Sequence, residues 1–231
     1  EGKVSIFFGS TGSPGTLDVD VDATLTKDPP EVDADFGRRV AVGDINGDGY
    51  GDVSVSSAFA DTGAVDSGEV RIYFGGPGAF DTTSDFTLTK SVPEAYAFFG
   101  RDLTMGDVNG DGFSDVIVGT PYANVSNIDN GEVHVFYGGP TFDSTVDVIV
   151  QNLDEPDGLF GFTVETGDLN NDSYDDLIVG AFSVNAGAIN SGDVRIFYGS
   201  SAGLGLTADA ILVNTPPEEN ARFGRWVSSG D

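Results

Sequence analysis

The 231-residue sequence contains no cysteine and a single histidine, His134. Disulfide bonds, zinc–thiolate sites and thiol nucleophiles are therefore excluded. With no cysteine and a single histidine, we do not expect the usual nucleophile–base arrangements in this sequence. We expect His134 to be an exposed strand residue rather than a catalytic base, and we predict that the chain is not an enzyme.

Basic residues are scarce: 10 Lys and Arg stand against 38 Asp and Glu, which gives a net charge of −28. Such a chain has no basic footprint for nucleic acid, and an anionic membrane surface would repel it. Divalent cations are its natural counter-ions. Asp predominates over Glu, and Asp is a poor helix or strand former but a good loop residue and metal ligand. The acidity indicates either an ordinary soluble surface or adaptation to a saline habitat.

Long apolar runs are also missing, since no segment approaches the roughly 18 residues that a membrane-spanning helix needs. We therefore expect no membrane insertion within this segment. No charged-then-apolar stretch at the N-terminus resembles a signal peptide, but the sequence starts at Glu1 rather than at Met. We interpret it as a mature, trimmed or partial chain.

A repeated pattern dominates what the sequence does contain. The pair Phe-Gly recurs at 36–37, 99–100, 160–161 and 223–224, at intervals of 63, 61 and 63 residues. After the first three pairs the sequences run in parallel as FGRRVAVGDINGDGYGDV, FGRDLTMGDVNGDGFSDV and FGFTVETGDLNNDSYDDL. A second block follows each of them, as GEVRIYFGG, GEVHVFYGG and GDVRIFYGS. Self-similarity at such a period indicates a repeat architecture.

Each unit contains four short apolar or alternating runs, which in the first copy cover 40–42, 53–57, 70–74 and 86–88. Gly, Asp, Asn and Pro bound these runs, and no stretch shows a sustained helical period, so the chain is predicted to be all-β. Four short antiparallel strands per repeat are typical of a β-propeller blade, because one sheet has to bury its faces against neighbouring blades. A stacked solenoid is the structural alternative.

The repeat divides the chain into three complete blades, at 36–98, 99–159 and 160–222. Segment 1–35 supplies the third and fourth strands of an earlier blade, and segment 223–231 begins a later blade at its first strand. Because propellers close with roughly 4–8 blades, we interpret the chain as an arc of a longer protein. Trp226, in the last segment, is expected to lie in the core.

An acidic loop lies between the first and second runs of every complete unit, with the pattern D-x-N-x-D-x-x-x-D. Positions one, three, five and nine offer side-chain oxygens, and position seven offers its backbone carbonyl. Hard oxygen donors in this number suit Ca²⁺, which accepts about 6–8 of them in irregular geometry. The predicted ligands are Asp44, Asn46, Asp48, Tyr50, Asp52, Asp107, Asn109, Asp111, Phe113, Asp115, Asp168, Asn170, Asp172, Tyr174 and Asp176. We expect three structural Ca²⁺ sites; the alternatives are solvated acidic turns or paired carboxylates for glycoside hydrolysis.

The loops begin like EF-hands, which need a bidentate Glu at position twelve and flanking helices. Position twelve is instead Val55, Val118 or Val179, and a strand follows each loop. We therefore predict that the ion clamps a β-hairpin. The third loop is expected to be the weakest, because Ser173 replaces the glycine that eases the sharp turn. Asp175 beside it is either a solvated neighbour or an alternative ligand.

The Phe-Gly pair, the D-x-N-x-D-G-x-x-D loop and the later G-E-V-x-V-F-x-G strand together resemble the FG-GAP repeat of integrin α-subunit propellers and their bacterial relatives. The resemblance implies a β-propeller with Ca²⁺ at the loop positions named above, and with Tyr50, Phe113 and Tyr174 as carbonyl donors. It also implies a role in adhesion. The lack of cysteine is unlike animal integrins and favours a bacterial or archaeal surface or secreted protein.

The leading interpretation is a non-enzymatic, extracellular or cell-surface module that binds a protein or glycan for adhesion. Its ligand is expected on loops that vary between units, at 60–67, 123–130 and 183–191, while Ca²⁺ holds the hairpins rigid. One alternative is the propeller portion of an extracellular polysaccharide- or lipid-cleaving enzyme whose catalytic part lies outside this segment; another is a passive spacer. N-x-S patterns at 124–126 and 171–173 match glycosylation sites, but the second lies inside an acidic loop and is discounted.

Overall fold

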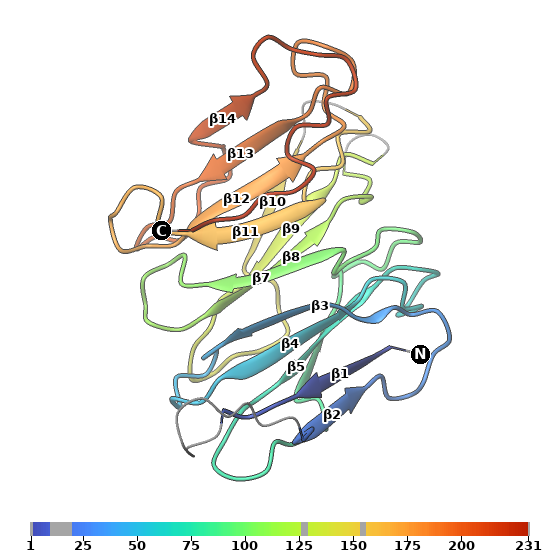
Figure 1. Ribbon diagram of the computed structural model, residues 1–231, viewed down its shortest axis with the longest axis vertical. Coiled ribbons are helices and arrows are strands. Elements are labelled where there is room, and N and C mark those ends of the chain that lie inside the picture. Colours follow the sequence, from blue (N-terminus) through green and yellow to red (C-terminus); the bar gives the residue numbers. More distant parts are fainter. Residues whose placement is uncertain (1, 10–19, 126–128, 153–155, 231) are drawn as a thin grey trace.

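The computed structural model describes residues 2–9, 20–125, 129–152 and 156–230. Strands are the only regular secondary structure in these residues, and strands that neighbour each other in a sheet run antiparallel (Figure 1). None of the described residues belongs to a helix long and apolar enough to cross a membrane. The prediction of an all-β chain is confirmed.

The strands build one two-stranded and three four-stranded sheets, and strand order follows chain order in each. The two-stranded sheet pairs β1 (Lys3–Ile6) with β2 (Ala23–Thr26). The first four-stranded sheet contains β3 (Phe36–Gly43), β4 (Asp52–Ser57), β5 (Glu69–Tyr73) and β6 (Phe86–Leu88). The second contains β7 (Asp102–Gly106), β8 (Asp115–Thr120), β9 (Glu132–Phe136) and β10 (Val148–Gln151). The third contains β11 (Thr163–Gly167), β12 (Asp176–Ala181), β13 (Asp193–Phe197) and β14 (Ala210–Val213).

The first hairpin of each four-stranded sheet has the same register. The glycine that ends the first strand lies opposite the aspartate that begins the second, in the pairs Gly43–Asp52, Gly106–Asp115 and Gly167–Asp176. In all three sheets, each acidic loop therefore begins and ends next to the same Gly–Asp pair of its hairpin. The four runs predicted in the first unit overlap β3, β4, β5 and β6 in turn.

Apolar side chains of successive sheets pack together between the sheets. Val70 and Leu88 of the first four-stranded sheet share a buried cluster with Val116 of the second. Val133 of the second shares another with Leu177 of the third. The first strands β3, β7 and β11 lie side by side, and the sheets follow one another along the long axis of the molecule (Figure 1). This arrangement is a partial β-propeller, as predicted.

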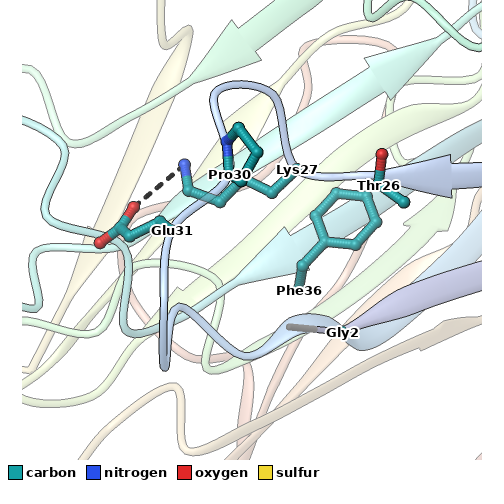
Figure 2. A pocket seen from close by; sticks show the side chains of 6 residues that line it. All are labelled: Gly2, Thr26, Lys27, Pro30, Glu31 and Phe36. Carbon is teal, nitrogen blue, oxygen red and sulfur yellow. Dashed lines mark ion pairs between the residues drawn. The ribbon is translucent and has the colours of Figure 1, made fainter.

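A polar cluster is buried between the two-stranded sheet and the first four-stranded sheet. Lys27 donates to Glu69 of β5 at 2.7 Å, and Arg71 donates to the same carboxylate oxygen at 2.7 Å. Figure 2 shows the other side of Lys27, which also pairs with Glu31 at 3.3 Å. The pocket at this place is lined by Gly2, Thr26, Lys27, Pro30, Glu31 and Phe36. The cluster neutralises a carboxylate that burial would otherwise leave without a counter-charge.

The single histidine of the sequence, His134, belongs to the equivalent cluster of the second four-stranded sheet. Lys90 lies 3.1 Å from Glu132, and Nε2 of His134 lies 3.0 Å from the other oxygen of that carboxylate. His134 is fully buried, with its ring edge-on to Phe99 at 5.2 Å between centroids. The expectation that His134 is exposed is wrong, because neighbouring sheets cover both faces of β9.

Trp226 is also placed differently from the expectation. Its side chain is 65% exposed, and residues 223–230 form no strand. The ring lies 5.5 Å from the guanidinium of Arg39 on β3, which is a cation–π distance. The expected place of Trp226 in the core is wrong, because no described sheet packs over the segment that follows β14.

Candidate metal centres

The three acidic loops, residues 44–52, 107–115 and 168–176, connect the first and second strands of the four-stranded sheets. Their fourth and sixth residues all have φ between 60° and 89°: Gly47, Gly49, Gly110, Gly112, Asn171 and Ser173. Glycine adopts this left-handed region without strain and Asn tolerates it, whereas Ser does so at a cost. The three loops therefore share one backbone shape, and the third holds it with the least suitable residue.

Side-chain oxygens of the first acidic loop accept hydrogen bonds from the loop's own backbone. Asp44 accepts from the amide of Gly49 at 2.9 Å, Asn46 from Asp48 at 2.9 Å, and Asp48 from Tyr50 at 2.9 Å. The second loop repeats all three bonds, and the third repeats the first and the last. These bonds hold the oxygens of positions one, three and five against the inside of the turn.

The carboxylate at position nine lies beneath each loop. Asp52, Asp115 and Asp176 are fully buried. The two oxygens of Asp52 accept from the amides of Ile45 and Gly75, each at 2.8 Å. The other two aspartates make the equivalent pair of bonds. Position nine therefore joins the loop to the segment that follows the third strand of its own sheet.

The described residues provide no counter-charge to the buried carboxylates of position nine. Among the described residues, no Lys, Arg or His forms an ion pair with Asp52, Asp115 or Asp176. Burial raises the pKa of Asp115 to about 7, and the charges of Asp111 and Asp107 add to the rise despite two backbone hydrogen bonds. Burial raises the pKa of Asp52 and of Asp176 as well. Each loop thus groups acidic side chains whose buried member has no basic ion-pair partner among the described residues.

The five predicted ligands of each set lie within one acidic loop of nine residues. No three Asp, Glu or His side chains of the described residues come together as a metal site by themselves. The three carboxylates of each predicted set therefore do not converge as a metal site in the described residues, and calcium binding at these loops stays a prediction. A set made only of oxygen donors fits a hard cation such as Ca²⁺ and does not fit metals that prefer nitrogen or sulfur.

Sequence reasoning missed the contact that the eighth loop position makes. The carboxylate of Asp175 accepts a hydrogen bond from the amide of Asp107 in the preceding acidic loop at 2.9 Å, so it is not merely a solvated neighbour; its role as an alternative ligand stays a prediction. A weak signal exists in the sequence, since this position is small or polar in every copy: Gly51, Ser114 and Asp175.

The loops expected to carry a ligand lie at the other end of the sheets. They follow β4, β8 and β12, whereas the acidic loops precede these strands. They are tied to the segment that enters the same sheet: Asp61 donates its amide to Glu31 at 2.7 Å, and Asn124 to Glu94 at 2.9 Å. Residues 126–128 lie outside the described residues, and so does the end of the N-x-S pattern at 124–126.

Stacked four-stranded antiparallel sheets, each with an acidic first hairpin, define a β-propeller of repeated blades. The FG-GAP repeat family model matches residues 36–73, 99–136 and 160–189, one segment for each four-stranded sheet. The chain therefore carries three FG-GAP repeats, which confirms the resemblance drawn from the sequence.

Similar proteins include integrins and a phospholipase. Integrin alpha-IIb of Mus musculus is 34% identical over 164 residues, which cover 67% of this chain and 15% of the relative. Integrin alpha-5 of Xenopus laevis is 30% identical over 183 residues, or 74% of this chain and 17% of the relative. Phosphatidylinositol-glycan-specific phospholipase D of Mus musculus is 36% identical over 125 residues, or 51% of this chain and 15% of the relative. The chain thus spans less than a fifth of these relatives.

Proposed function

We propose that this chain is a calcium-binding, non-enzymatic β-propeller module of a secreted or cell-surface protein, with a role in adhesion. The observation that carries the calcium binding is position nine, where Asp52, Asp115 and Asp176 are buried and no basic side chain of the described residues pairs with them. A buried carboxylate without a counter-charge is costly, and a bound cation removes that cost. The same buried Asp recurs in all three repeats, which supports a shared role for position nine.

Positions one, three, five, seven and nine of each acidic loop would hold the ion. A bound Ca²⁺ supplies the positive charge that the loop lacks. The role is structural, because these positions run from the end of the first strand to the start of the second and would fix one hairpin. An extracellular location suits such sites, since calcium-binding modules outside cells operate at about 10⁻⁴–10⁻³ M Ca²⁺.

Thermal unfolding with and without a chelator tests this proposal. We expect EDTA at low salt to lower the melting temperature of the chain sharply, and excess CaCl₂ to restore it, because binding to the folded state alone stabilises that state. MgCl₂ at the same concentration is the control and should restore less, since Mg²⁺ demands a more regular geometry. An unchanged melting temperature after addition of EDTA would contradict the calcium proposal.

The adhesive role is supported by the similarity to integrin alpha chains and by the division of the molecule into two ends. One end carries acidic loops of repeated sequence, whereas the other carries loops that differ between repeats. Loops 60–67 and 183–191 would provide ligand contacts. Arrays of glycans and of extracellular proteins, probed with and without Ca²⁺, test this role. No binding on either array would favour a passive spacer.

A second candidate function follows from the similarity to phosphatidylinositol-glycan-specific phospholipase D. The chain would then be the propeller portion of a lipid-cleaving enzyme whose catalytic part lies outside these 231 residues. A longer natural protein containing this chain would hydrolyse a glycosylphosphatidylinositol substrate, while the chain alone would not. Equal lack of activity in both would remove this candidate.

A further inference from the structure

Neighbouring acidic loops are hydrogen-bonded to each other. The amide of Ser114, eighth in the second loop, donates to the carbonyl of Asp44, first in the first loop, at 2.9 Å. The amide of Asp175 donates to the carbonyl of Asp107 at 2.9 Å, and its side chain accepts from the amide of Asp107 at 2.9 Å. The first ligand position of one loop is therefore held by the eighth residue of the next.

An aromatic ring adds a second contact between the loops. The ring of Phe113, at position seven of the second loop, lies against Gly47, so that a Cβ on Gly47 would come within 2.1 Å of it. The ring of Tyr174 lies in the same way against Gly110, where the distance would be 2.2 Å. Position four of the first two loops therefore needs glycine for space as well as for its positive φ.

The third acidic loop has no such cover in the described part of the chain. Its second residue, Leu169, is 47% exposed, whereas the equivalent Ile45 and Val108 are fully buried. The carbonyls of Ile45 and Val108 accept hydrogen bonds from Gly139 at 2.7 Å and Ser200 at 3.1 Å, in the sheet that follows. A hollow beside the third loop is lined by Gly167, Asp168, Leu169, Asn171, Ser229 and Gly230. The chain thus contains two covered loops and one open loop.

We infer that the three loops bind Ca²⁺ cooperatively, and that residues seven and eight of the second and third loops transmit the coupling to the loop before each. The inference rests on the calcium binding proposed above and adds how the sites influence one another. Phe113 and Ser114 couple the second loop to the first, and Tyr174 and Asp175 couple the third to the second.

The physical reason is shared ordering. When the carbonyl of Phe113 is engaged by an ion, Phe113 and Ser114 are fixed in the position that covers the first loop and bonds Asp44. The first loop then has less conformational freedom to lose on binding its own ion, which raises its affinity. The coupling free energy is reciprocal, so filling the first loop also tightens the second.

The test uses the whole 231-residue chain, stripped of metal and titrated with CaCl₂. Asp111→Ala removes a donor from the second loop and leaves the first loop's own donors intact. Deuterium exchange of the amides of residues 44–52, followed at each calcium concentration, reports on the first loop alone. We expect the concentration that half-protects these amides to rise at least about fivefold, the lower end of typical coupling between sites.

A second variant separates coupling from metal binding. Phe113→Ala keeps the backbone carbonyl of the second loop but removes the ring from Gly47, so it should also raise the half-protecting concentration for residues 44–52. Tyr96→Ala is the matched control. It removes an aromatic ring that is 57% exposed and belongs to the other end of the sheets, where the Tyr96 amide donates to Val65 at 2.8 Å, and it should shift that concentration less than about twofold.

The possible outcomes separate this inference from the proposed function. If neither Asp111→Ala nor Phe113→Ala changes the calcium dependence of residues 44–52, the coupling is wrong and calcium binding stands. If the loop amides of the unaltered chain do not respond to CaCl₂ at all, the calcium proposal fails, and the coupling fails with it.

Discussion

Glu132 and His134 lie two residues apart on β9 with a carboxylate oxygen 3.0 Å from the imidazole Nε2, and both side chains are buried. Lys90, in the connection that follows β6, donates to the same carboxylate at 3.1 Å. Burial by itself raises the pKa of Glu132, but the interactions with His134 and Lys90 outweigh it and bring the pKa below its ordinary value of 4.5. This charge network ties the first and second four-stranded sheets together.

The network predicts a loss of stability in acid. Because the folded state lowers the pKa of Glu132, its contribution is fully present above the unfolded value and is lost as the pH falls through the folded value. We expect Glu132→Gln to lower the free energy of unfolding at neutral pH by about 2 kcal/mol and to reduce its fall between about pH 5 and pH 3. Urea unfolding at constant calcium measures both effects. Glu219→Gln, at an exposed position, is the control; equal pH slopes for Glu132→Gln and the unaltered chain would contradict the account.

The packing between sheets predicts a large effect at Phe160. Its ring is fully buried in the cluster between the second and third four-stranded sheets, 6.1 Å from the ring of Phe197. Phe160→Ala should lower the free energy of unfolding by about 3–5 kcal/mol, because it removes buried apolar surface and leaves a cavity. Val92→Ala, at a position that is 71% exposed, should change it by less than about 0.5 kcal/mol. Similar urea midpoints for the two variants would show that the sheets do not pack as described.

Substitutions at Gly131 and Gly78 distinguish the cost of backbone strain from the cost of a steric clash. Gly131 has φ of 86°, and a Cβ there would lie 2.1 Å from the carbonyl oxygen of Phe160. Gly78 has φ of 116° with open space around it. Gly78→Ala should cost about 1–2 kcal/mol through the backbone angle, and Gly131→Ala should cost about 1–3 kcal/mol more, because the backbone at Phe160 has to move. Equal costs in thermal unfolding would mean that the approach of Phe160 to Gly131 is not as close as the structure has it.

Because the acidic loops concentrate charge, Asp111→Asn should have different effects on the melting temperature with and without calcium. Asp111→Asn keeps an oxygen for the amide of Phe113, which Asp111 accepts at 3.0 Å, but removes a charge that opposes ionisation of Asp115. Without calcium, the variant should melt at the same temperature or higher. With saturating CaCl₂ it should melt about 2–4 °C lower, the shift expected for about 1 kcal/mol in a chain of this size. A lower melting temperature in both conditions would contradict the assigned charge balance.

Much of the fold could be predicted from the spacing of the repeat. The Phe-Gly pairs and the apolar runs between turn residues located β3 to β6 and their counterparts, because period and turn chemistry are local properties of the sequence. His134 and Trp226 were placed wrongly, because burial depends on what lies above each face. His134 stands on a strand that both neighbouring sheets cover, whereas Trp226 follows the last strand of the described residues.

The residue types and spacing of the acidic loops could be predicted from the sequence, but the contacts between the loops could not. Ligand types and spacing stand in the sequence as D-x-N-x-D-x-x-x-D, and the structure places these residues in three equivalent loops. The bonds from Ser114 to Asp44 and from Asp175 to Asp107 join residues about a repeat apart. No local pattern predicts them, since they depend on how neighbouring sheets stack.

Calorimetric titration of the metal-stripped chain with CaCl₂ tests the central claim most directly. The account predicts binding of three Ca²⁺ per chain, with the stoichiometry reduced by one when Asp107, Asn109 and Asp111 are replaced together by Ala. No detectable binding at millimolar CaCl₂, or a stoichiometry that the triple replacement leaves unchanged, would contradict it.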